Sequence, residues 1–191
     1  MEDLNVLVER LTGKDEPGAE AAALQLAEAG PEGMTRIEPL LRSEDQDHRW
    51  WAIRTLAAMD DPDSGWFRRA LRDPSAEVRA AAALALVAHP NPAAVEDLIQ
   101  ALDDEDSLTA SLATRALVVA GESAVPGLLE AYPAATPRAR IQAVRALAEL
   151  RDVRAIRLLL QASEEGSAAV QYWAREGLNM LGLDMIYLTP E

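Results

Sequence analysis

Two histidines are the residues of this sequence best suited to general acid–base catalysis, because an imidazole exchanges protons near neutral pH. They are His48 and His89, and neither lies within a catalytic pattern. The sequence contains no cysteine, so it offers neither a thiolate nucleophile nor a thiolate metal site. It also lacks a serine in a glycine-flanked elbow, a glycine-rich phosphate loop and a histidine-rich metal spacing. We therefore predict a protein that is not an enzyme, with no catalytic residues, no metal site and no cofactor.

Three acidic runs, at 44–47, 60–63 and 103–106, are where carboxylates that could bind a cation are most concentrated. Calcium binding at 103–106 is one interpretation, because hard cations prefer oxygen ligands. However, this run lacks the spaced ligands and the glycine of a dedicated calcium loop. All three runs precede expected helices, where carboxylates accept hydrogen bonds from unpaired N–H groups and complement the helix dipole. We predict that they cap helices.

The sequence is strongly acidic, with 32 Asp and Glu residues against 18 Lys and Arg residues and a formal net charge of −14. Nucleic-acid binding depends on a basic surface that neutralises phosphates, so this balance argues against a nucleic-acid partner. It argues against anionic membrane surfaces for the same reason. The N-terminus lacks the pattern of a secretion signal, and no stretch reaches the ~20 apolar residues of a membrane span. We expect a cytoplasmic protein with neither nucleic acid nor membrane as a partner.

An Ala-x-x-x-Leu pair recurs six times along the chain, with steps of 30, 30, 31, 30 and 31 residues. The pairs are Ala22/Leu26, Ala52/Leu56, Ala82/Leu86, Ala113/Leu117, Ala143/Leu147 and Ala174/Leu178. Residues four apart lie on one face of an α-helix. In most repeats a second small residue follows three positions after the alanine, which allows another helix to approach closely: Thr55, Ala85, Ala116, Ala146 and Gly177. Each pair therefore predicts a helix with a narrow, tightly packed contact stripe.

A second helix is predicted after each of the first five pairs, with apolar residues at i, i+3 and i+4. The sets are Ile37/Leu40/Leu41, Phe67/Leu71, Val95/Leu98/Ile99, Val125/Leu128/Leu129 and Ile156/Leu159/Leu160. A helix–turn–helix unit of this size cannot bury its apolar faces alone, whereas stacked units bury one another's. The sequence therefore predicts an all-α fold, an α-solenoid of about five helical pairs plus capping helices.

Two stretches carry a family resemblance, DPSAEVRAAAALAL at 73–86 and NPAAVEDLIQAL at 91–102. The units resemble HEAT repeats, in particular the short 30-residue variety named after phycobilisome bilin lyases, and the resemblance covers roughly residues 14–181. It implies a HEAT/armadillo-like superhelix whose second helices line a concave face. It also allows a bilin-lyase-like, chromophore-handling protein as an alternative function, or a regulatory subunit of a separate enzyme.

On the second helices, two rows of outward positions follow from the apolar stripe. One row is Glu9, Arg42, Arg69, Gln100, Glu130 and Gln161, and the other is Val6, Pro39, Trp66, Asp97, Gly127 and Leu158. Trp66 is the only aromatic residue of its row, and Trp and Arg dominate binding energy at many interfaces. We therefore predict that Trp66, Arg69, Arg42 and Arg72 bind an acidic or amphipathic segment of another protein. The alternative is that Trp66 fills an irregular contact in its repeat.

The organisation expected is a single domain over 1–191, with a capping helix at 1–13, repeats over 14–181 and a tail at 182–191. The tail contains four consecutive apolar residues, 185–188, which either fold back over the last helix or complete a homodimer. Three arginines, Arg49, Arg79 and Arg140, share one position of the repeat, and we expect them to form a ladder of arginine–carboxylate bonds along the links. The function predicted is a non-catalytic protein–protein interaction scaffold or adaptor.

Overall fold

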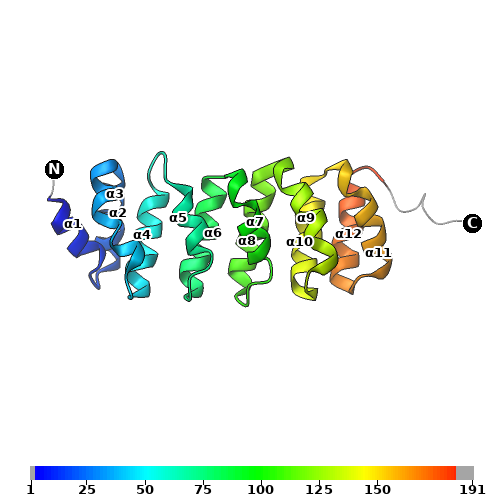
Figure 1. The fold of residues 1–191 in the computed structure, drawn as a ribbon, viewed down its shortest axis with the longest axis horizontal. Helices are drawn as coiled ribbons and strands as arrows, with labels where there is room; N and C mark the ends of the chain where they lie inside the picture. The colour runs from blue at the N-terminus through cyan, green and yellow to red at the C-terminus, as the bar shows by residue number, and fades with distance from the viewer. Residues whose placement is uncertain (1–2, 184–191) are drawn as a thin grey trace, which may run out of the picture. The chain divides into compact units, whose positions relative to one another are not determined.

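A computed structural model of the chain describes residues 3–183, apart from the side chain of Glu165. The described residues form α-helices and short 3-10 helices, with no strand among them (Figure 1). The chain divides after His89 into two compact units, called unit 1 and unit 2 below. The single-domain organisation stays a prediction. The apolar tail residues 185–188, and with them the expected fold-back or dimer contact, lie outside the described residues.

Helices of two kinds alternate along the chain. The helices that carry the Ala-x-x-x-Leu pairs are α2 (Glu16–Glu28), α4 (Gln46–Ala57), α6 (Ala76–Ala88), α8 (Ser107–Ala120), α10 (Pro137–Leu150) and α12 (Ala168–Met180). The second helices are α1 (Leu4–Leu11), α3 (Pro31–Ile37), α5 (Ser64–Ala70), α7 (Val95–Ala101), α9 (Val125–Ala131) and α11 (Ile156–Glu165). The 3-10 helices are η1 (Leu40–Arg42), η2 (Pro92–Ala94), η3 (Gly121–Ala124), η4 (Tyr132–Ala134) and η5 (Val153–Ala155). Within the described residues, five helical pairs follow α1 and precede α12, which confirms the predicted α-solenoid.

The alanine–leucine pairs form the core, as predicted. All twelve of their side chains are buried, and none is more than 3% exposed. The small residues that stand three positions after five of the six alanines are buried too, including the polar Thr55. In unit 1, α2, α4 and α6 pack against one another in chain order, and in unit 2 α8, α10 and α12 do the same. Each unit is thus built on a layer of closely packed first helices.

One buried position is equivalent in all six second helices, and the sequence predicted it correctly for only some of them. This series is Leu7, Ile37, Phe67, Leu98, Leu128 and Leu159, each at most 2% exposed and separated by the same 30, 30, 31, 30 and 31 steps as the alanines. Ile37 is therefore the equivalent of Phe67, so the position equivalent to Trp66 is Arg36. Asp97, which was assigned to an outward row, is buried and only 5% exposed. The assignment of Pro39 and Arg42 to the two outward rows was wrong by one turn. The reason is Pro39, because α3 ends ahead of it and the stripe breaks there.

Acidic and hydroxyl side chains begin the helices, as the three acidic runs predicted. Asp45, Asp63 and Asp106 are N-caps whose carboxylates accept hydrogen bonds from backbone N–H groups at the starts of α4, α5 and α8. Ser75 and Thr136 do the same for α6 and α10. The three carboxylates of this group therefore satisfy N–H groups that have no partner within their helices.

Residues Ser107–Ala134 form a run that is long and apolar enough to cross a membrane by length and composition alone, with a mean hydropathy of 1.3. The run is not one straight helix. Gly121, with a φ of 69°, ends α8 and begins η3, which precedes α9. Helix α8 packs on α7 and α10. The 14 residues of α8 rise about 21 Å, less than the ~30 Å of a bilayer core. The helix therefore matches a packed helix of unit 2 rather than a membrane span.

Gly33 on α3 lies very close to the backbone of α2. A Cβ atom built on Gly33 would lie 1.9 Å from the carbonyl oxygen of Leu26 and 2.9 Å from its carbonyl carbon. Since those atoms are backbone, no side-chain rotation relieves the overlap, and α3 would have to move. The close packing of the first pair thus depends on the missing side chain at this position.

Gly33→Ala should lower the free energy of unfolding by about 2 kcal/mol, because overpacking of up to ~3 kcal/mol exceeds the ~1 kcal/mol gained in helix propensity. Urea denaturation followed by circular dichroism measures this difference. The control is Gly18→Ala in α2, where the new Cβ would meet only the rotatable Asp15 carboxylate. That variant should be neutral or slightly more stable. Equal stability of the two variants would contradict the close approach.

Candidate functional site

The structure brings three of the four predicted binding residues together on unit 1. The guanidinium carbons of Arg42 and Arg69 each lie 5.0 Å from the centre of the Trp66 ring. Trp66 and Arg69 come from α5, whereas Arg42 comes from η1 of the preceding repeat. The turn that Pro39 forces after α3 places Arg42 there, so two repeats contribute to one stack. We call these residues the Trp66 cluster.

The two arginines of the Trp66 cluster differ in their remaining contacts. Arg42 donates a hydrogen bond to Glu38 at 3.0 Å, in an exposed ion pair that contributes little to stability. Arg69 is exposed and has no hydrogen-bond or ion-pair partner among the described residues. Trp66 is half-buried, and both guanidinium groups lie against its ring. The cluster therefore offers N–H donors held in place by stacking.

A cavity of about 240 Å³ lies beside the Trp66 cluster and is lined by all three of its residues. Arg49 and Asp73 also line the cavity. They form a bidentate ion pair, in which the Nε–Oδ2 and Nη2–Oδ1 distances are both 2.7 Å. The hydrogen bond from Arg49 to the Asp73 carboxylate raises the pKa of the arginine above its usual value, although burial opposes the shift. Arg72, the fourth predicted binding residue, is exposed but does not line this cavity.

The three arginines at one repeat position all bond to the link that precedes their helix. Arg49 donates to the carbonyl oxygens of Ser43 and Glu44 as well as to Asp73. Arg79 donates to the carbonyl oxygen of Asp73 at 2.9 Å, and Arg140 to that of Pro133 at 2.8 Å. The ladder was predicted to consist of arginine–carboxylate bonds. Arg49 makes such a bond, to Asp73, whereas the hydrogen bond of Arg140 ends on a backbone carbonyl.

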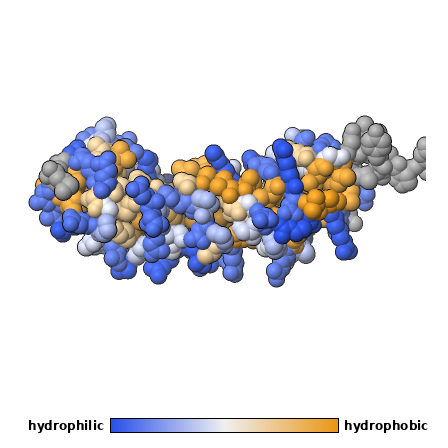
Figure 2. Space-filling view, turned by 90° about the horizontal axis from the view of Figure 1, so that it is seen from above, coloured by the Kyte–Doolittle hydropathy of each residue, from blue (hydrophilic) through white to orange (hydrophobic). Residues whose placement is uncertain are grey.

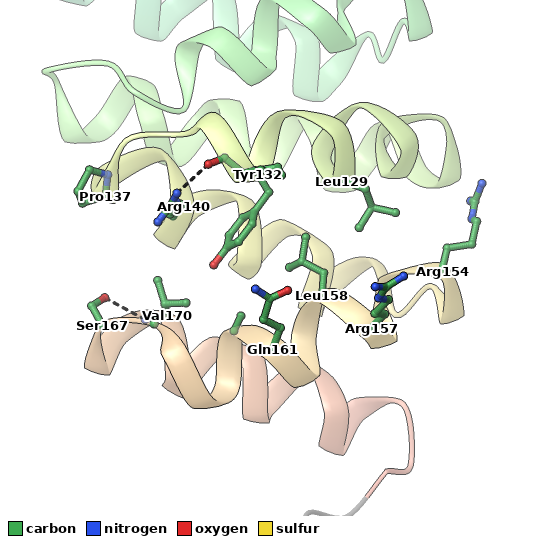
Figure 3. Close-up of a pocket in the computed structure, with 13 residues that line it drawn as sticks. Leu129, Tyr132, Pro137, Arg140, Arg154, Arg157, Leu158, Gln161, Ser167 and Val170 are labelled. Carbon is green, nitrogen blue, oxygen red and sulfur yellow. Dashed lines mark hydrogen bonds between the residues drawn. The ribbon is translucent and has the colours of Figure 1, made fainter.

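Unit 2 contains a groove of about 930 Å³ that the sequence did not reveal (Figure 3). We call it the arginine groove, because Arg140, Arg154 and Arg157 line it and none of its thirteen described lining residues is Asp or Glu. Tyr132 and Arg140 lie at one end, Arg154 and Arg157 lie at the other, and Leu158 lies between them (Figure 3). Only Leu158 and Gln161 of this groove belong to the outward rows read from the sequence.

The charges of the arginine groove are compensated to different degrees. Arg154 donates to both carboxylate oxygens of Asp152, at 2.9 and 2.6 Å, and these bonds lower the pKa of Asp152 to about 2. Arg140 lies over the Tyr132 ring, 5.6 Å from its centre, and has no carboxylate partner among the described side chains. Arg157 is exposed and has no hydrogen-bond or ion-pair partner in the described part of the chain. Among the described side chains of the groove, the positive charges of Arg140 and Arg157 are therefore uncompensated.

Each histidine lies within hydrogen-bonding distance of an oxygen atom of the chain. His89 lies 2.8 Å through Nε2 from the carbonyl oxygen of Ala57, and its ring stacks on Phe67. His48 lies 3.3 Å from the hydroxyl of Ser43. Among residues 3–183 no group of three or more His, Asp or Glu side chains is arranged to hold a metal ion.

Comparison with known families decides the relationship. The family described as HEAT repeats matches residues 42–118 and 65–133, and the PBS lyase HEAT-like repeat matches residues 139–165. The chain belongs to the HEAT-repeat family. Its repeats include the phycobilisome lyase type, as the resemblance of the stretches at 73–86 and 91–102 implied. No curated protein is significantly similar to this HEAT-repeat chain in sequence.

Several solved structures resemble the HEAT-repeat chain in fold. An engineered protein has a TM-score of 0.55 and 22% identity, with 95% of this chain and 99% of that chain covered. The complex of CpcE and CpcF of phycocyanin lyase from Nostoc sp. PCC7120 has a TM-score of 0.55 and 19% identity, over 95% of this chain and 78% of that chain. A designed armadillo repeat protein in complex with the peptide (KR)4 has a TM-score of 0.50 and 16% identity, over 94% and 100%. At these identities the similarity shows the fold alone.

Proposed function

We propose that this protein is a non-catalytic scaffold or adaptor that binds a segment of another protein at the Trp66 cluster. The observation that carries the proposal is the stack of Arg42 and Arg69 on Trp66 beside a cavity. The stack orders two guanidinium groups before any partner binds, which reduces the entropy lost on binding. HEAT repeats elsewhere in the chain are built from packing residues, so function resides in such departures from the repeat.

The chemistry of the cluster favours an acidic or amphipathic segment as the partner. Guanidinium N–H groups bind carboxylates through paired hydrogen bonds, and the unpaired Arg69 leaves its donors available. The half-buried Trp66 ring and the adjoining cavity provide apolar surface for a neighbouring side chain. We expect this binding to take place in the cytoplasm, with neither nucleic acid nor membrane involved.

A pull-down from host lysate should capture a partner with the wild-type chain and lose it with the Trp66→Ala, Arg69→Ala double variant. Loss of an aromatic and arginine anchor pair is expected to weaken binding at least ~30-fold, about 2 kcal/mol or more. The matched control is Tyr172→Ala, Arg175→Ala, which removes one aromatic ring and one guanidinium from α12. It should capture the partner as the wild type does, and circular dichroism should show all three proteins folded.

If both double variants capture the same partner as the wild type, the Trp66 cluster is not the binding site, and another face of the scaffold binds. If the α12 control loses the partner and the Trp66 variant keeps it, the site lies on unit 2. Both results would contradict the assignment to the Trp66 cluster.

A bilin-lyase-like role is the alternative, supported by the matched lyase-type repeat at 139–165. Binding of a bilin would change its absorbance spectrum on mixing with the chain. A regulatory subunit of a separate enzyme is distinguished by the pull-down, because its captured partner would be that enzyme.

A further inference from the structure

We propose that the arginine groove of unit 2 is a second binding site, which takes an acidic protein segment with carboxylates on both sides of a large apolar residue. The proposal shares with the proposed function the idea of a protein segment as ligand, but it concerns different residues and another unit. It is carried by the shape of the groove, by the position of its charges and by the contrast with the rest of the chain.

The groove has the size and lining of a binding site rather than of a packing defect. Its volume of about 930 Å³ is near the upper end of the range for small-ligand pockets. Leu129 and Leu158 line it, and both are only half-buried, so apolar surface stays in contact with water. Covering that surface with an apolar side chain is favourable. The middle of the groove therefore fits one large apolar residue.

The charges are placed at the two ends of this apolar surface. Arg140 lies at one end beside Tyr132, and Arg157 lies at the other beside Arg154 (Figure 3). Burial raises the pKa of Tyr132 above its usual value, so the hydroxyl keeps its proton and is a hydrogen-bond donor at neutral pH. A ligand that matches both ends carries an acceptor group before and after its apolar residue.

The contrast with the whole chain makes the groove distinctive. Acidic residues outnumber basic residues by 32 to 18, yet the described lining contains three arginines and no acid. Figure 2 shows hydrophilic and hydrophobic residues intermixed over the face it displays. The net charge of −14 repels a long polyanion at a distance, which disfavours nucleic acid more than a short acidic segment.

The test uses fluorescence anisotropy with a labelled peptide, acetyl-Glu-Asp-Leu-Leu-Glu-Asp, and the full chain. Three further probes identify other occupants: the same peptide with lysine at each acidic position, a labelled single-stranded oligonucleotide, and biliverdin followed by its absorbance. We expect the acidic peptide to bind, and to bind more weakly as the NaCl concentration rises. We expect the lysine peptide and the oligonucleotide to bind at least tenfold more weakly.

The variant Arg140→Glu, Arg157→Glu should weaken binding of the acidic peptide at least tenfold. The matched control is Arg115→Glu, a reversal of an exposed arginine on α8 outside the groove, which should change the affinity less than twofold. Trp66→Ala, Arg69→Ala should also leave this binding unchanged, because those residues belong to unit 1. Circular dichroism melting curves check that each variant is folded.

Several results would overturn the proposal. They are no binding of the acidic peptide at millimolar concentration, equal or tighter binding of the lysine peptide, the oligonucleotide or biliverdin, and unchanged affinity in the groove variant. Loss of binding in the Trp66 variant alone would assign the acidic segment to unit 1, so the proposed function would stand while this inference fails. Loss in the groove variant alone supports the inference whatever the lysate experiment shows.

Discussion

Replacing Phe67 with alanine should lower the free energy of unfolding by about 4 kcal/mol, because a fully buried aromatic ring would leave a cavity that a close-packed core closes only in part. Phe67 is 0% exposed and is the only phenylalanine of the chain. Its ring stacks on His89, with 6.1 Å between ring centres, and α5 packs on α6. Because α5 has only seven residues, few other side chains hold it in place.

Urea denaturation followed by far-UV circular dichroism and by tryptophan fluorescence measures the loss. Three of the four tryptophans, at positions 50, 51 and 66, lie in unit 1, so fluorescence reports mainly on the unit that contains Phe67. Phe67→Leu keeps most of the apolar volume and should cost much less. The control Leu84→Ala, at a residue 53% exposed, should stay within about 0.5 kcal/mol of the wild type. A loss below 1 kcal/mol for Phe67→Ala would show that the second repeat is loosely packed.

The core of each repeat was predictable from the sequence because its determinants are local. An alanine and a leucine four residues apart define one helix face wherever they occur, and their spacing of 30 or 31 residues defines the stacking. The helix N-caps were predictable for the same reason, since an N-cap and the N–H groups it satisfies are two or three residues apart. The register of the second helices failed only at Pro39, where one proline ended the helix earlier than the apolar pattern indicated.

The two candidate sites differ in how many of their residues could be predicted from the sequence. Trp66 and Arg69 are three residues apart on one helix, so they were found together. Arg42 was predicted as a binding residue because it was assigned to an outward row that it does not occupy. It lies over Trp66 because the turn after Pro39 places it there. The arginine groove was missed because Tyr132, Arg140 and Arg157 belong to three different elements. Only their packing in three dimensions brings them to one groove, although a locally basic segment at 138–157 was a signal in the sequence.

Asp73→Ala should lower the free energy of unfolding by about 3 kcal/mol, the second largest effect we expect. The side chains of Arg49 and Asp73 are only 13% and 9% exposed, and the two form two hydrogen bonds of 2.7 Å. Removing the carboxylate leaves a mostly buried guanidinium without its countercharge, which is costly even though two backbone carbonyls remain as acceptors. The N–H of Ser75, which donates to the same carboxylate at 2.9 Å, also loses a partner. Urea denaturation of the variant measures the loss.

The double variant Arg49→Met, Asp73→Leu tests whether the Arg49–Asp73 ion pair stabilises the fold or whether Arg49 binds a ligand. Replacing both partners by apolar groups removes the buried charge as well as its partner, so most of the stability lost in Asp73→Ala should return. If Asp73→Ala were neutral instead, Arg49 would not need its countercharge, and the guanidinium would be a candidate anion ligand in the cavity beside Trp66. Because Arg49 also lines that cavity, the double variant should keep the fold while removing a charge from the proposed binding site. Partner capture by a folded double variant would therefore show that Arg42 and Arg69, rather than Arg49, supply the positive charge used in binding.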